Sequence, residues 1–161
     1  MVAQLHVGRD LVLRTVLLLG VLTTAQAMAA RLGVQSLAAH TIAFRIWMFT
    51  AYASDGVEAA GQTMVAHRLG SGDVDAIRAV VQRLLGWALV LGMTMAIAIG
   101  AGSGALPRIF SDDAALVAAA ATTLLWVAVL QPFHAIAFAL AGMLVGAAEQ
   151  TLLAKAMAVS A

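Results

Sequence analysis

One apolar stretch, residues 37–62, restricts the fold more than any other feature, because it combines the length of a membrane helix with ionisable side chains. These side chains are His40, Arg45, Asp55 and Glu58. Hydrocarbon cannot solvate an ion, and an ionised side chain near the centre of a bilayer costs about 2.5–3.5 kcal/mol. We therefore expect these residues to face the interior of a helical bundle or a wet cavity.

The composition of the whole chain also places it in a membrane. Of 161 residues, 63% are hydrophobic and 11% are charged, with a mean hydropathy of +0.97. Soluble domains contain about 45–50% apolar and about 25% charged residues. A net charge of +1 gives no support to nucleic-acid binding, and the absence of cysteine excludes disulfides and thiolate metal sites within the chain.

Five apolar runs, separated by glycines, prolines and charged residues, predict an all-α, polytopic membrane protein. A helix needs about 20 residues to cross the hydrocarbon core. We therefore expect residues 1–161 to form a single bundle with four transmembrane helices and the start of a truncated fifth. The predicted helices are about 9–30, 36–69, 77–105, 113–147 and 151–161.

Small residues and a proline predict how these helices pack. Gly142 and Gly146 form a GxxxG pattern, and Gly92 begins a second stripe of small residues, so other helices should approach closely there. Pro132 interrupts the fourth run, where it removes a backbone hydrogen bond and predicts a kink. The residues expected to cap this helix at its start are Ser111 or Asp112.

The distribution of basic residues predicts the orientation in the membrane. One side should hold the start of the first helix and the loops after the second and fourth helices. The basic residues on that side are Arg9, Arg14, Arg68, Arg78, Arg83 and Lys155. The other side has only Arg31 and Arg108. Basic residues concentrate on the cytoplasmic side, so we expect a multi-pass protein of the inner (cytoplasmic) membrane with the first side inside.

Polar side chains of the second predicted helix share one stripe. At 100° per residue, an arc of about 100° contains Arg45, Tyr52, Asp55 and Gln62, with Glu58 at its edge. A carboxylate in a poorly solvated cavity takes up a proton readily, and its proton affinity changes with its access to water and cations. We predict that Asp55 and Glu58 couple transport to a cation, either H⁺ or Na⁺.

Further residues are predicted to line the cavity and tune this site: Tyr52, Gln62, Arg45 and His134. His134 follows Pro132 and either faces a cavity or donates to a carbonyl that the proline frees. Trp47 is expected to be a packing or interface residue. The alternative for the two acids is that neighbouring groups satisfy them, so that they only fix the packing of helices.

No motif predicts an enzyme, a cofactor or a bound metal. The sequence has no His-Glu-x-x-His pattern, no clustered set of His and Asp ligands and no nucleophile elbow. We therefore expect no catalytic residues, no cofactor and no metal site.

Several segments in a fixed order resemble the multidrug and toxin extrusion (MATE) transporters of the DinF-like branch. They are similar to the opening of the seventh helix, the eighth helix and its following loop, the outer loop before the tenth helix, and the tenth helix. The segments that carry this resemblance are 8–15, 37–40, 55–56, Gln62, 68–73, 110–113, 131–133 and 142–147. Branch members commonly carry an acid just before the glycine of the tenth-helix motif, where this chain has Ala141.

The resemblance implies twelve helices in two six-helix lobes, of which this chain is most of the second lobe. It further implies export of cationic or amphipathic compounds in exchange for protons or sodium by alternating access. The implied partners are a small cationic or amphipathic substrate, membrane lipid, and either an N-terminal lobe or a second copy of the chain. We expect that this chain does not transport alone.

Three alternatives to this function remain open at the level of the sequence. A flippase for a lipid-linked substrate is compatible with the same polar stripe. A membrane scaffold or assembly protein that transports nothing, or a degenerate fragment, would carry the same helices without using Asp55.

Overall fold

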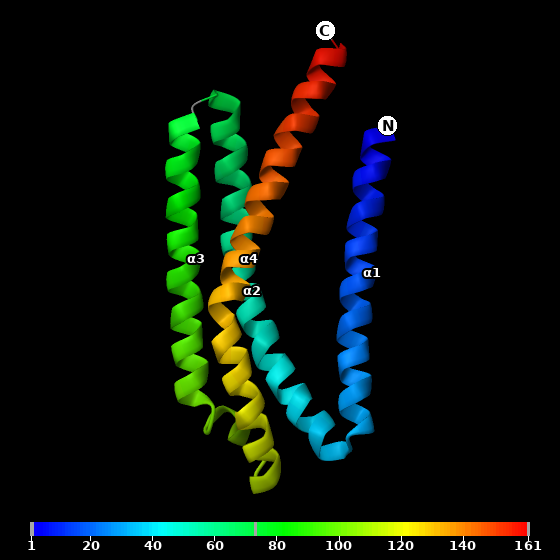
Figure 1. The fold of residues 1–161 in the computed structure, drawn as a ribbon, viewed down its shortest axis with the longest axis vertical. Helices are drawn as coiled ribbons and strands as arrows, with labels where there is room; N and C mark the ends of the chain where they lie inside the picture. The colour runs from blue at the N-terminus through cyan, green and yellow to red at the C-terminus, as the bar shows by residue number, and fades with distance from the viewer. Residues whose placement is uncertain (1, 73, 161) are drawn as a thin grey trace.

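The computed structural model describes the backbone of residues 2–72 and 74–160, and the side chains of residues 12, 16–17, 19–72 and 74–147. Over these residues the chain is helical and contains no strand, which confirms the predicted all-α class (Figure 1). The helices are α1 (Val2–Arg31), α2 (Val34–Ser71), α3 (Val74–Gly102), the short 3-10 helix η1 (Leu106–Ile109) and α4 (Ala114–Ser160).

Two of the helices are long and apolar enough to cross a membrane. They are Val74–Gly102, with a mean hydropathy of 2.0 over its most apolar window, and Ala114–Ala147, with 1.9. Among the described residues, α2 does not reach the same criterion. The count of four membrane spans therefore stays a prediction.

The helix boundaries differ from the predicted ones at two places. Helix α1 begins at Val2 rather than near residue 9. Helix α4 continues to Ser160, so the predicted segments 113–147 and 151–161 form one helix. No glycine or proline stands between residues 147 and 160, and Glu and Gln are good helix formers, so nothing in this part of the sequence ends the helix.

Glycine and aspartate set the turns between helices. Gly33 precedes α2 with φ +110°, and Gly72 follows α2 in the left-handed region with φ +70°, a conformation that favours glycine. The cap of α4 differs from the predicted Ser111 or Asp112: Asp113 Oδ1 accepts hydrogen bonds from the backbone N–H groups of the second and third residues of the helix, over 2.8 and 3.2 Å. Asp113 is one residue closer to the helix and therefore in register with these groups.

Helix α4 crosses both α2 and α3 and forms the centre of the bundle, whereas α1 lies apart from α3 and α4 and packs against α2 near their common turn (Figure 1). The core consists mostly of small and aliphatic side chains. One cluster holds Val65, Leu84, Ala88, Ala135, Ala139 and Met143. A second holds Ala43, Ile99, Leu124 and Ala128.

The glycine contacts confirm the predicted close packing of helices. A Cβ on Gly142 would collide with the backbone carbonyl of Glu58, and one on Gly146 with that of Gln62. A Cβ on Gly92 would lie 2.7 Å from Pro132 Cα. The backbones of α2 and α3 therefore touch α4 directly, and these contacts fix the height at which the polar residues of α2 meet α4.

The start of the first helix and the turn after the second lie at one end of the bundle, as predicted, whereas the predicted loop after the fourth helix is part of the continuous helix α4. Both termini and the turn from α2 to α3 lie at one end, and the turn from α1 to α2 lies with η1 at the other (Figure 1). The side chains of Arg9, Arg14 and Lys155 lie outside the described residues. The basic residues described at the first end are Arg68, Arg78 and Arg83, and those at the second are Arg31 and Arg108.

Candidate functional site

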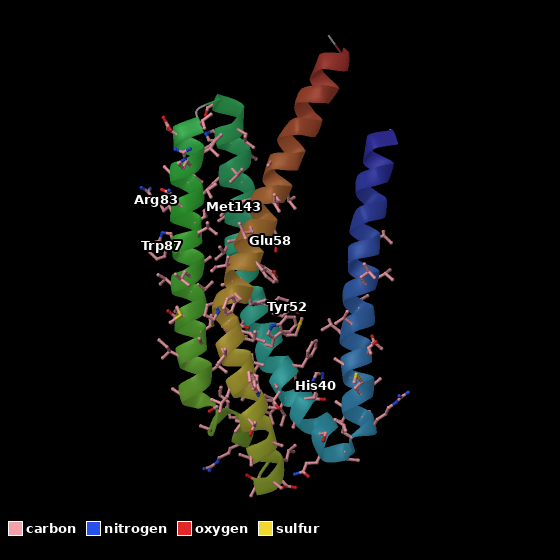
Figure 2. All side chains as sticks on the ribbon, in the orientation of Figure 1. His40, Tyr52, Glu58, Arg83, Trp87 and Met143 are labelled. Carbon is pink, nitrogen blue, oxygen red and sulfur yellow. The ribbon has the colours of Figure 1, made fainter. Side chains whose placement is uncertain are left out.

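The predicted polar stripe forms one side of α2. Figure 2 shows Tyr52 and Glu58 on the side of α2 that faces α1. Tyr52 is 67% exposed, and Asp55 is also exposed. Glu58 and Gln62 are half-buried, because their backbone carbonyls face Gly142 and Gly146 of α4. The stripe therefore runs from an open face of α2 into the contact between α2 and α4.

His134 of α4 lies against aromatic rings. Its imidazole packs on Trp47 of α2, with ring centroids 5.4 Å apart, and edge-to-face on Phe138, with centroids 4.5 Å apart. Two further rings of α2 continue this row, with Phe44 next to Trp47 and His40 next to Phe44. The imidazole is thus held in a fixed place by apolar contacts rather than by polar ones.

Both ring nitrogens of His134 are shielded from solvent, and neither has a hydrogen-bond partner among the described residues. Buried polar atoms are nearly always paired, and leaving one unpaired costs about 1–3 kcal/mol. An atom that bears such a cost is a candidate for a functional role.

His134 of α4 packs on Trp47 of α2, and Asp55 follows Trp47 on the same helix by about two turns. A carboxylate and an imidazole can each bind one proton, and together they can share or pass one. The packing of α4 on α2 therefore brings into one region of the bundle two groups that are 79 positions apart in the sequence and can both exchange protons.

Gln131 and Thr50 are buried polar residues that the sequence analysis did not single out as site residues. Gln131 is 1% exposed and donates a hydrogen bond from Nε2 to Oγ1 of Thr50 over 2.9 Å. The signal in the sequence was the position of Gln131, a polar residue one turn before His134 in an otherwise apolar run. Trp47, expected as a packing residue, is the direct neighbour of His134.

Arg45 lies away from Asp55 along α2. Ten residues of helix separate Arg45 from Asp55, which corresponds to about 15 Å. The exposed Arg45 side chain instead lines a pocket of about 360 Å³ between α2 and the region of η1 and the start of α4, with Phe110 and Leu116 opposite. The structure therefore does not bring Arg45 to the predicted coupling site.

His40 belongs to a separate pocket between α1 and α2. This pocket has a volume of about 230 Å³, and its polar lining residues are Thr23, Gln26, His40 and Thr41. Figure 2 shows His40 between these two helices. Within the part of the chain that the structure describes, no group of three or more His, Asp or Glu side chains is placed to hold a metal ion.

Comparison with known proteins assigns the chain to a family. The family model MatE matches residues 11–161. Among curated proteins, "Protein DETOXIFICATION 43" of Arabidopsis thaliana is 33% identical over 142 residues, which are 88% of this chain and 27% of that protein. "Protein DETOXIFICATION 45, chloroplastic" of the same plant is 30% identical over 84% of this chain and 24% of that protein.

A bacterial relative is similar as well. "Probable multidrug resistance protein NorM" of Xanthomonas axonopodis pv. citri (strain 306) is 35% identical over 70% of this chain and 24% of its own length. The chain spans about a quarter of the length of these curated relatives. No solved structure matches it significantly. From the family match over nearly the whole chain we conclude that it belongs to the MatE family of integral membrane transporters.

Proposed function

We propose that this chain is part of the second lobe of a secondary active efflux transporter of the DinF-like branch, located in the inner membrane. The transporter exchanges protons or sodium for cationic or amphipathic compounds by alternating access. Asp55 is the coupling carboxylate and Glu58 is the second acid of the site. Tyr52, Gln62 and His134 tune the site, and Arg45 lines the other end of the same face of α2.

The observation that carries this proposal is the imidazole of His134, which packs on α2 about two turns before Asp55. Both of its ring nitrogens are shielded from solvent and lack a partner among the described residues. A bundle that used these residues only for packing would gain stability from an apolar side chain at position 134. A site that binds and releases protons needs both groups, because each can hold the proton that the other gives up.

The charge on Asp55 links the ion to the substrate. The unprotonated carboxylate attracts a cationic compound, and protonation removes that attraction. Proton and substrate therefore compete for one site, which is the requirement for exchange. The exposed Tyr52 lies one turn before Asp55 and offers an aromatic face to a cation and a hydroxyl to a polar group.

Other parts of the transporter cover the open face of α2 in this proposal. An exposed acid on a membrane helix is costly against lipid, so Asp55 needs a wet cavity in front of it. The partner that closes this cavity is an N-terminal lobe or a second copy of the chain. The chain alone is expected to insert into the membrane without transporting substrate.

The test is export by the complete transporter in lipid vesicles, driven by an imposed pH gradient or by an imposed sodium gradient. We expect Asp55→Asn to lower ion-driven export of a fluorescent organic cation at least about 100-fold, the upper range of coupling between two sites. Membrane insertion should not change, because asparagine is the same size as aspartate.

The matched control is Asp112→Asn, which makes the same change at an exposed position in the loop before α4. This variant should export at the wild-type rate. Full export by Asp55→Asn under both gradients would remove Asp55 from the mechanism. Uptake of a lipid-linked substrate in place of the organic cation would favour a flippase.

A further inference from the structure

The hydrogen bond between Gln131 of α4 and Thr50 of α2 has no part in the mechanism proposed above. Both side chains are buried, with 1% and 2% of their surfaces exposed. Gln131 donates to the Thr50 hydroxyl over 2.9 Å, and this hydroxyl donates onward to the backbone carbonyl of Trp47 over 2.7 Å. Because the bond is enclosed by α2 and α4 themselves, it does not depend on what else covers the two helices.

This bond closes a loop of contacts that contains His134. Thr50 holds the backbone of Trp47, the ring of Trp47 packs against the ring of His134, and His134 follows Gln131 by one turn of α4. Each side of the loop is therefore a direct contact or a single helical turn. A shift of α4 along α2 would break the hydrogen bond and the ring contact together.

This loop of contacts lies beside Pro132, where the backbone of α4 lacks one helical hydrogen bond. Pro132 has no N–H, so the carbonyl four residues before it loses its helical hydrogen bond. Gly92 of α3 packs directly on this point: a Cβ there would come 2.7 Å from Pro132 Cα and 2.9 Å from the backbone oxygen of Gln131. Helix α3 supports this part of α4 by shape, and Thr50 on α2 supports it by a directional polar bond.

We propose that Gln131 and Thr50 are positioning residues: their hydrogen bond keeps α2 and α4 in the register that places His134 against Trp47, on the helix that carries Asp55. This role rests on the proposed function, since the register matters for transport only if Asp55 and His134 couple transport to the movement of protons. Neither residue touches substrate in this proposal. Their contribution is to hold the imidazole of His134 at a constant position against α2.

The test compares variants that remove each half of the bond at nearly constant volume. Gln131→Met removes the amide donor, and Thr50→Val removes the hydroxyl. Thr50→Ser keeps the hydroxyl and should restore wild-type behaviour. The matched control is Thr41→Val, the same change at a half-buried site on α2 where the hydroxyl bonds only to the backbone of its own helix, over 2.8 Å.

The first readout is the distance between α2 and α4 in the complete transporter, measured with spin labels at Phe49 and Val129. These side chains are 73% and 61% exposed, and the chain has no cysteine of its own to interfere. Thr50→Val and Gln131→Met should each shift or broaden the distance distribution. Thr50→Ser and Thr41→Val should leave it as in the wild type.

The second readout is proton-driven export as a function of pH. Loss of one buried hydrogen bond typically changes an equilibrium by about 2- to 10-fold, so we expect the maximal rate to fall by about that factor and the pH profile to shift, with KM for substrate unchanged. The double variant should lose no more than either single variant, because both remove the same bond.

The outcomes separate the two proposals. Altered distances with altered coupling support the positioning role. Unaltered distances, or altered distances with an unchanged pH profile, overturn it. If Asp55→Asn retains export while Thr50→Val alters the distances, the proposed function fails and the bond between the helices stands as a structural contact alone. Should Gln131→Met fail to insert, Thr50→Val tests the same bond.

Discussion

At the scale of single residues, the account depends on His134 and Asp55. The imidazole is surrounded by Trp47 and Phe138, and its nitrogens lack partners among the described groups. An imidazole whose nitrogens are shielded and unpaired costs stability, and a protein that uses it gains a second proton-binding group besides the Asp55 carboxylate. Stability and function should therefore respond in opposite directions when it is replaced.

The variant His134→Leu tests whether stability and export respond in opposite directions. Leucine keeps an apolar side chain against Trp47 and removes both nitrogens, so we expect a higher unfolding temperature and proton-driven export lowered about 5- to 150-fold. Thermal unfolding of the purified protein and export from vesicles measure the two effects. The control is His40→Leu on α2, which should change export little. A loss of stability with export retained would show that the ring serves packing.

The sequence could supply only part of this site. The polar stripe with Asp55 follows from helical periodicity, which a single helix determines by itself. The neighbour of Asp55 on another helix depends on how α2 and α4 cross, and that depends on shape at residues far apart in the chain. The bond between Gln131 and Thr50 spans 81 positions and was missed for this reason.

At the scale of helices, two glycines set how closely α4 approaches α2. The GxxxG pattern predicted a packing face, and the structure places Gly142 against the Glu58 carbonyl and Gly146 against the Gln62 carbonyl. The pattern could not indicate which helix packs on these glycines or at which of its residues the two helices meet. The sequence also predicts an end of the fourth helix at residue 147, whereas α4 continues to Ser160 because Glu149 and Gln150 both favour a helix.

Gly142→Ala should destabilise the bundle by about 1–3 kcal/mol, the usual cost of overpacking, because the added methyl meets the backbone of α2. Gly56→Ala makes the same change on α2 at a place where a Cβ meets nothing within 4 Å. That control should be neutral or slightly stabilising, since alanine favours helix. Unfolding temperatures in detergent distinguish them, and equal temperatures for the two variants would contradict the close contact.

At the scale of the whole molecule, the helices divide the basic residues between two ends. Arg68 and Arg78 lie near the turn between α2 and α3. Arg108 lies in η1, and Arg31 is the last residue of α1. The arrangement of ends follows from four antiparallel helices, which the lengths of the apolar runs predicted. Among the described residues, α3 and α4 are long and apolar enough to cross the bilayer, and the count of four spans stays a prediction.

Two single-cysteine variants test the orientation, because the chain has no cysteine. Ser103→Cys, between α3 and η1, should react with a membrane-impermeant thiol reagent added to intact cells. Ser71→Cys, at the end of α2, should react only after the cells are opened. Labelling of Ser71→Cys in intact cells would reverse the proposed orientation, and labelling of neither would show that residue 103 is not outside.

The most direct measurement of the central claim is the release of protons when substrate binds to the purified transporter in a weakly buffered solution. If Asp55 holds the proton that substrate displaces, the wild type releases protons and Asp55→Asn releases none, while Asp112→Asn behaves as the wild type. Proton release of wild-type size from Asp55→Asn would contradict the claim.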